Sequence, residues 1–370
     1  MLSVDLIKLT LFFTFILLLG SLKTMAYQFK TTEKKLTSKI PKIWRLMIFT
    51  VALNAGFSVS AADLPDSLAL IQQLGIQQDD LSNLERSKTV NFDLVEGNEK
   101  ELAAGVAIYL PASPDKIINT IKNKGLSAID NDVTAEGIIH KQATQESFKK
   151  FSLKAGSDEA ENFMAATPGN EFNLSTGEFQ SIKAASSEST EAASQTYRAI
   201  LQQRLQAYRQ NGLKGIATYD RGNGTEANPA EELRSATQDS KLLARYFPDV
   251  YKAWLNYPVA FPDGTDEGFY WLNRRVEGRP TAILGHRVIV SSAAGEVILA
   301  RQFYVGHSYN SNQLIIACLP YLDGSLVLYA NRNFTDQVAG FGSGLKHSIG
   351  REQMRGEIIK RLRNLHKAIK

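Results

Sequence analysis

The last quarter of the chain constrains the fold most. Four strand-like segments between residues 281 and 332 lead directly into a long amphipathic helix that ends at Lys370. Residues 293–296 separate the first two segments, and Asp323-Gly324 separates the last two, as in hairpins. A meander followed by one terminal helix, whose apolar residues recur at helical spacing, predicts an α+β fold. We expect an antiparallel curved sheet packed on a long C-terminal helix, with a cavity between them.

The first hairpin also predicts a site. Pairing Ser292 with Val297 places His286 on the same face as Arg301, Phe303 and His307, because side chains alternate along a strand. Polar groups among apolar neighbours are typical of a ligand pocket. The predicted ligand-binding residues are His286, Arg301, Phe303, His307 and Tyr309. Two other roles stay open for the polar members of this set: hydrogen bonding within the fold, which is the common role of buried polar groups, and catalysis or metal ligation.

The N-terminal 62 residues have the pattern of an export signal. Two apolar runs, 9–19 and 46–59, are each shorter than the roughly 20 residues that span a bilayer. Basic residues precede the second run, and small residues follow it, which predicts a signal peptide cleaved after Ala61 or Ala62. Met25 is an alternative start. We therefore expect a periplasmic or secreted protein, with an uncleaved N-terminal membrane anchor as the alternative.

The leader also explains the basic character of the whole chain, whose net charge is +4. Residues 1–62 contain eight Lys or Arg and two Asp or Glu, so 34 basic and 36 acidic residues remain in 63–370. The remaining charge of −2 argues against nucleic acid as a partner. The one cysteine, Cys318, lies in an apolar run and is expected to be buried, so no internal disulfide is expected.

Residues 63–370 are expected to form a single domain. Strands are predicted at 89–94, 102–110, 133–141 and 147–153, and Ser113-Pro114 is a typical start for a helix that continues to Lys124. From about 154 to 259 the pattern is helical, and we interpret this block as an insertion.

In this order of elements the chain resembles the START-like (helix-grip, SRPBCC) superfamily. Residues 102–124 look like the opening strand and helix of that family, and 281–370 look like its closing strands and grip helix. The helical block at 154–259 departs from the family pattern. The chain is also similar to uncharacterised exported bacterial proteins. The resemblance implies a cavity for a lipid, sterol, polyketide or other apolar ligand, and it supplies no catalytic residue.

The sequence therefore favours an exported protein that binds an apolar or amphipathic, lipid-like small molecule between the sheet and the C-terminal helix. One alternative is an exported hydrolase or isomerase that uses His286 or His307 as acid or base, and another is a structural envelope protein that engages a partner. Basic residues on the C-terminal helix make peripheral membrane contact a further expectation. We expect no cofactor and no metal, because the chain has no His-Glu-x-x-His segment and no cysteine pair.

Overall fold

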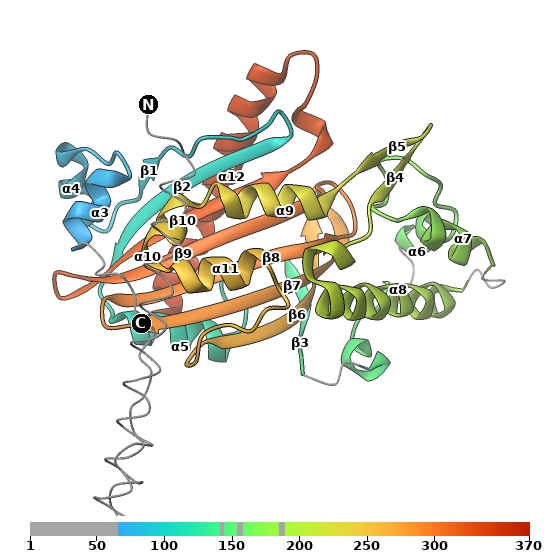
Figure 1. Cartoon of the computed structure of the whole chain (residues 1–370), viewed down its shortest axis with the longest axis horizontal. Helices are drawn as coiled ribbons and strands as arrows, with labels where there is room; N and C mark the ends of the chain where they lie inside the picture. The colour runs from blue at the N-terminus through green and yellow to red at the C-terminus, as the bar shows by residue number, and fades with distance from the viewer. Residues whose placement is uncertain (1–65, 141–143, 154–157, 185–188) are drawn as a thin grey trace, which may run out of the picture. The chain divides into compact units, whose positions relative to one another are not determined.

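The computed structural model describes residues 66–140, 144–153, 158–184 and 189–370. The predicted leader, with its cleavage positions at Ala61 and Ala62, and the predicted start of the helical block at residue 154 lie outside the described residues. The described residues form an α+β fold around one eight-stranded antiparallel sheet, with the strand order β1-β2-β10-β9-β8-β7-β6-β3 (Figure 1). The predicted α+β class, with a large antiparallel sheet and a C-terminal helix, is confirmed.

The sheet consists of β1 (Val90–Phe92), β2 (Glu101–Leu110), β3 (Val133–Ile139), β6 (Asp266–Val276), β7 (Arg279–Ser292), β8 (Gly295–Val305), β9 (Ser311–Tyr321) and β10 (Gly324–Phe334). A separate two-stranded hairpin joins β4 (Tyr219–Gly222) to β5 (Thr225–Ala227). The helices are α3 (Ser67–Gln73), α4 (Gln78–Glu85), α5 (Pro114–Lys124), α6 (Glu159–Met164), α7 (Thr176–Ala184), α8 (Thr190–Asn211), α9 (Pro229–Gln238), α10 (Lys241–Tyr246), α11 (Pro248–Leu255) and α12 (Ser343–Ile369). Short 3-10 helices are η1 (Gln145–Phe148), η2 (Gly212–Gly215) and η3 (Asp336–Val338).

The hairpin register differs from the prediction. Ser292 lies opposite Gly295 rather than Val297, so the loop between β7 and β8 contains only two residues. A shift of two residues keeps each side chain on its expected face, because strands alternate with period two. The face assignment near this turn therefore holds although the predicted pairing was wrong.

A bulge in β8 reverses the assignment farther from the turn. It adds one residue, Phe303, so that Leu284 lies opposite Tyr304. Tyr304 consequently joins Leu284 on the face that carries His286, which we call the His286 face. Val305 packs in a different cluster on the opposite side. Uninterrupted alternation from Arg301 would put Val305 on the His286 face and Tyr304 on the other, so the bulge reverses both positions.

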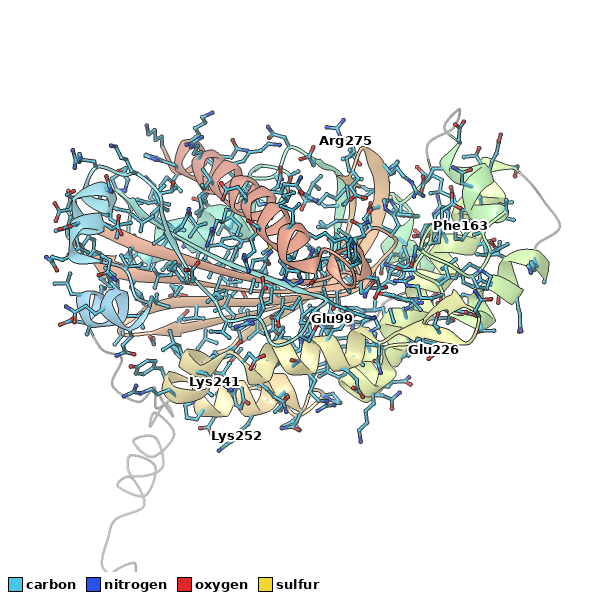
Figure 2. All side chains as sticks on the ribbon, turned by 90° about the horizontal axis from the view of Figure 1, so that it is seen from above. Glu99, Phe163, Glu226, Lys241, Lys252 and Arg275 are labelled. Atoms are coloured by element: carbon cyan, nitrogen blue, oxygen red, sulfur yellow. The ribbon has the colours of Figure 1, made fainter. Side chains whose placement is uncertain are left out.

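Helices cover both faces of the sheet, as the view in Figure 2 shows. On the His286 face, Val288, Val290 and Leu299 pack in one cluster with residues of α3, α10 and α11. On the other face, Ile289 and Ile298 pack with residues of α5 and α12, and we call this the α12 face. Strands buried on both sides read as nearly continuous apolar runs, which explains why both faces of the meander look apolar in the sequence.

Helix α12 packs along only part of its length. Ile358, Leu362, Leu365 and Ile369 are buried, whereas Leu345 is 70% exposed and Ile349 is 51% exposed. The predicted apolar stripe therefore has two parts. The C-terminal half of α12 holds the helix on the sheet, and its first turns extend beyond the packed core.

The structure also bears on two further local predictions, a helix cap and a strand. The cap of α5 is confirmed, because Ser113 Oγ accepts a hydrogen bond from the backbone N–H of Lys116 at 3.3 Å. The strand predicted at 147–153 was wrong, since η1 occupies its start and residues 149–153 have turn or irregular backbone. The sequence pattern also missed β6, which lies outside every predicted strand.

Candidate ligand-binding site

The structure separates the five predicted site residues into three places. His286, Arg301 and Phe303 lie together on the His286 face. His307 lies beyond the end of β8, and Tyr309 lines a cavity on the α12 face. The expected single constellation therefore does not form, because the bulge and the end of β8 intervene.

His286 and Arg301 lie directly opposite each other, and both are 0% exposed. The His286 ring stacks on Phe269 with 4.4 Å between centroids. The guanidinium carbon of Arg301 lies 3.8 Å from the centroid of the Trp254 ring, and Arg301 Nη2 donates a hydrogen bond to the Trp254 carbonyl at 2.7 Å. These contacts hold both side chains in a packed aromatic cluster.

Burial keeps His286 neutral. It lowers the pKa of the imidazole to about 4, against the opposing effect of Glu267, whose Oε1 lies 3.1 Å from Nε2. The hydroxyl of Tyr208 lies 2.9 Å from Nδ1, and its ring stacks on Phe303 at 4.1 Å. The described part of the structure has two large cavities, one on each face of the sheet, and His286, Arg301 and Phe303 line neither of them. The aromatic cluster around His286 and Arg301 is therefore a filled part of the interior.

His307 has polar partners on both ring nitrogens. Nε2 lies 2.8 Å from Thr281 Oγ1, and Nδ1 lies 2.7 Å from Ser308 Oγ. His307 is 1% exposed, and burial, with a smaller contribution from Arg279, lowers its pKa to about 4. These contacts fix the connection between β8 and β9, which is a structural role.

A cavity of about 580 Å³ lies on the α12 face, among the sheet, α5 and the N-terminal half of α12. We call it the α12 cavity. Its volume is within the range typical of small-molecule sites. Aliphatic side chains form much of its lining: Leu102, Ile121, Leu126, Ile129, Leu272, Ile298, Leu314, Ile316, Ile349 and Met354.

A row of amides crosses the floor of the α12 cavity. Gln302, Asn312 and Asn333 lie directly opposite one another on the neighbouring strands β8, β9 and β10. Tyr309, the one predicted residue in this cavity, donates a hydrogen bond from its hydroxyl to Gln302 Oε1 at 2.6 Å. The Oδ1 of Asn333 has no hydrogen-bond partner among the described residues. The row gives an aliphatic cavity a strip of hydrogen-bonding groups.

Arg287 is the most distinctive group in the α12 cavity. It is half-buried and has no hydrogen bond or ion pair within the described ranges, and its Nε is shielded from solvent. Its neighbours across the sheet are Gly268 and Ala300, two small residues that leave space around it. A partly buried guanidinium without an anion is unfavourable, because desolvation is not offset by an opposite charge.

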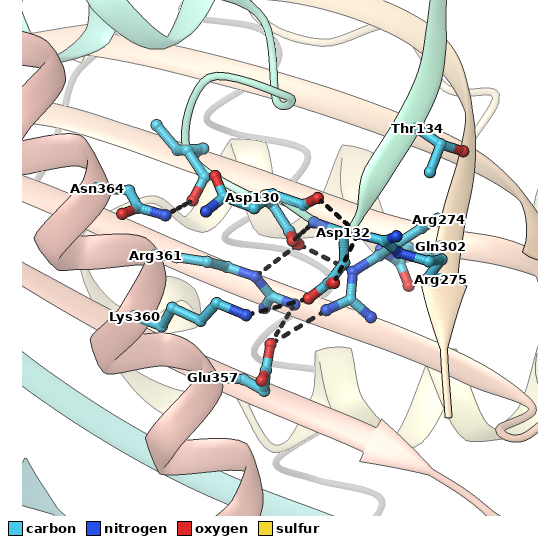
Figure 3. Close-up of polar contacts among 12 residues, drawn as sticks. Asp130, Asp132, Thr134, Arg274, Arg275, Gln302, Glu357, Lys360, Arg361 and Asn364 are labelled. Carbon is cyan, nitrogen blue, oxygen red and sulfur yellow. Dashed lines mark hydrogen bonds and ion pairs between the residues drawn. The ribbon is translucent and has the colours of Figure 1, made fainter. Parts of the chain in front are cut away.

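The other arginines around this cavity are neutralised by carboxylates (Figure 3). Asp130 Oδ2 accepts hydrogen bonds from Arg274 Nε and from Arg361 Nε, both at 2.9 Å. Arg274 Nη2 also donates to Glu357 Oε2 at 3.3 Å. Burial alone would raise the pKa of Asp130, but Arg361 and Arg274 outweigh it and lower that pKa. This network joins α12 to β6 and to the loop before β3, and among the described arginines that line the cavity it leaves Arg287 without a carboxylate.

The sequence contained a signal for Arg287 that the histidine-based prediction did not use. Arg287 interrupts the apolar run of β7 and alternates onto the face opposite His286. Only the tertiary structure shows that α12 stands away from the sheet over this face.

Comparisons with known proteins add no assignment: no protein-family model matches the chain, and a search of the curated proteins finds no match. Among the described helices, none is long and apolar enough to cross a bilayer. The described residues also contain no group of three or more His, Cys, Asp or Glu that could hold a metal ion.

Proposed function

We propose that the protein binds an amphipathic, lipid-like small molecule in the α12 cavity, with an acidic group of the ligand at Arg287. The unpaired guanidinium inside a largely aliphatic cavity is the observation that carries this proposal. An anionic ligand group would supply the opposite charge that the protein does not provide.

The aliphatic lining supports a hydrocarbon part of the ligand. Burial of apolar surface contributes roughly 25 cal/mol per Å², so a chain lying along Leu314 and Ile316 would add favourable free energy without directional contacts. The amides of Gln302, Asn312 and Asn333 would pair with carbonyl or hydroxyl groups between the acidic end and the chain.

The resemblance to the START-like superfamily is part of this proposal. It implies a ligand cavity between the sheet and the terminal helix, which is where the α12 cavity lies. Export to the periplasm or outside the cell, with cleavage after Ala61 or Ala62, also remains a proposal and rests on the leader sequence. The acid–base alternative has no supporting observation, because His286 and His307 are almost fully buried and line neither large cavity.

We also propose that the first turns of α12 contact a lipid surface. Leu345 and Ile349 lie one turn apart on α12 and are 70% and 51% exposed, and Phe341, two residues before the helix begins, is fully exposed at 102%. Ile349 and the neighbouring Lys346 also line the α12 cavity. An apolar stripe with an adjacent lysine is suited to an anionic membrane interface, and here it leads to the cavity in which we propose that the ligand binds.

Native mass spectrometry with oleate as the probe tests the proposed ligand site. We expect the wild-type protein to bind oleate, and Arg287→Gln to weaken binding at this site at least tenfold because the charge-assisted hydrogen bond is lost. Arg287→Lys should give an intermediate affinity. Arg275→Gln is the control, since Arg275 is exposed and pairs only loosely with Asp132 at 3.7 Å. Equal oleate binding by wild type and Arg287→Gln, or none by the wild type, would contradict the proposal.

A further inference from the structure

A second cavity, of about 610 Å³, lies on the His286 face of the same sheet. Its walls come from α3, from β1 with the segment after it, and from α10. Half-buried small and aliphatic residues of the central strands form its floor, including Ile315, Ala317 and Ala330. We call it the α10 cavity. Because the sheet separates it from the α12 cavity, the two cavities can be occupied independently.

One buried polar side chain, Gln313, lines the α10 cavity and has a fixed orientation. Gln313 is 2% exposed, and its Oε1 accepts hydrogen bonds from Thr237 Oγ1 at 2.8 Å and from Trp254 Nε1 at 3.0 Å. The indole N–H of Trp254 can only donate, so the amide cannot be reversed without losing this bond. The single hydroxyl proton of Thr237 is also within reach of the Leu233 carbonyl, at 2.8 Å, and does not fix the orientation by itself. Its Nε2 is therefore a donor, and it has no partner among the described residues.

The surroundings of Gln313 favour an acceptor that carries negative charge. Its neighbours across the sheet are Arg301 on one side and Arg332 on the other. Arg332 is paired with Glu101, but Arg301 forms no ion pair within the described part of the chain. Lys241, at the margin of the same cavity, is paired with Asp239 at 3.8 Å and adds no net charge. Arg301 is therefore the nearby positive charge that favours a negatively charged acceptor at Nε2.

We infer that the α10 cavity is a second ligand site, which takes a fatty acyl chain. An oxygen of the acyl carboxylate or ester accepts the hydrogen bond of Gln313 Nε2, and the hydrocarbon lies over Ala317 and Ala330 toward Leu70 and Leu74. Small residues in the floor leave room for the chain, and a buried unsatisfied donor gains the most from an acceptor. This inference does not rest on the proposed function, because the two sites share no lining residue.

Ligand stoichiometry tests the second site. Native mass spectrometry with oleate should show two molecules bound per wild-type protein, and one after Gln313→Glu at concentrations near the wild-type dissociation constant. The glutamate keeps an oxygen for Thr237 and Trp254 but removes the donor, so oleate affinity at this site should fall at least tenfold. Titration of wild type and Gln313→Glu with methyl oleate distinguishes a free acid from an ester. If Gln313→Glu loses the second equivalent of oleate but not that of methyl oleate, the site recognises a free carboxylate. If it loses the second equivalent of both ligands, the site recognises an acyl oxygen in general.

Matched cavity-filling variants assign the two equivalents. Ala330→Leu adds volume in the α10 cavity, and Ala300→Leu adds it in the α12 cavity. We expect each to remove one equivalent, and circular dichroism checks that both remain folded. Two equivalents in both Gln313→Glu and Ala330→Leu would overturn the second site. Loss of one equivalent in Ala300→Leu and Arg287→Gln alone would overturn the α10 site and support the α12 site. Loss of one equivalent in Ala330→Leu and Gln313→Glu alone would support the α10 site and contradict the α12 site.

Discussion

His286 and His307 are both almost completely buried, and burial lowers the pKa of each to about 4 from an ordinary value of 6.5. In the unfolded chain each histidine takes up a proton as the pH falls below about 6.5, whereas in the folded protein it does so only near 4. The stabilisation from keeping them neutral is therefore complete above about pH 6.5. It is lost progressively between pH 6.5 and 4.

His307 gives the cleaner test of this residue-scale effect, because no carboxylate contributes to its pKa shift. We expect His307→Gln to be destabilised at pH 7, through lost contacts with Thr281 and Ser308. The difference in unfolding free energy from wild type should shrink by about 1–3 kcal/mol between pH 7 and pH 4.5. Urea unfolding at both pH values measures it. A difference that does not change with pH would rule out this account of His307.

Position 285 has room only for glycine, because the ring of Tyr270 covers it. A Cβ atom at this position would lie 2.1 Å from the ring of Tyr270, which lies directly opposite on β6 and covers the glycine. We expect Gly285→Ala to lower the unfolding free energy by about 1–3 kcal/mol, because the ring must move. Gly268→Ala is the matched control, since its nearest neighbour would be Arg287 Nη2 at 3.8 Å, and it should be neutral or slightly stabilising. Equal effects of the two substitutions in chemical denaturation would be inconsistent with this explanation.

At the scale of elements, α12 is held by two kinds of contact. Its C-terminal half buries Ile358, Leu362 and Leu365 against the sheet and α5. Its middle is joined to β6 and the loop before β3 through Asp130. The first contact supplies most of the burial. The second fixes where the helix stands above the α12 cavity.

Asp130→Asn tests this ionic junction. The substitution removes the carboxylate that Arg274 and Arg361 both contact at 2.9 Å and leaves them only the longer contacts to Glu357, so we expect a loss of about 1–3 kcal/mol in unfolding free energy. Asp93→Asn, which removes the partner of Arg355 at a position 95% exposed, should cost less than about 1 kcal/mol. Thermal and urea unfolding compare the two. The junction would have no structural importance if both variants were equally stable.

The β8 bulge shows what a pattern of elements cannot specify. Alternation along β7 and β8 correctly places His286 beside Arg301, but it continues past Phe303 and assigns Val305 and His307 to the same face. One inserted residue reverses the pattern, and the insertion leaves no mark in a sequence whose two faces are both apolar.

For the molecule as a whole, the proposed lipid contact predicts vesicle binding. Protein lacking residues 1–62 should bind vesicles that contain anionic phospholipid. Replacing Phe341, Leu345 and Ile349 by serine should weaken binding at least tenfold, because burial of each side chain is worth roughly 1.5–3 kcal/mol at most. The control replaces Leu68, Val259 and Leu322, which are exposed elsewhere and line neither proposed ligand site, by serine. Co-sedimentation that is equally weakened in both triple variants would contradict a specific contact through α12.

The sequence by itself determined the α+β class, the four strands of the meander, the presence of a turn between the last two strands and the terminal helix. The predicted Asp323-Gly324 turn is displaced by one residue, because Gly324 already pairs with Tyr321 in the sheet. These features depend on local periodicity, turn chemistry and capping, which a chain expresses residue by residue. It also located the polar residues of the strands, although it favoured the histidine face as the site.

Only the tertiary structure decided which of those polar residues meet a cavity. Whether a side chain is enclosed depends on how closely a distant helix approaches its strand. Residues of α11 pack tightly over His286 and Arg301, whereas the first half of α12 and the helix α10 stand away from the sheet over Arg287 and Gln313. These distances are set by long-range packing and by the Asp130 ion pairs, which no local pattern encodes.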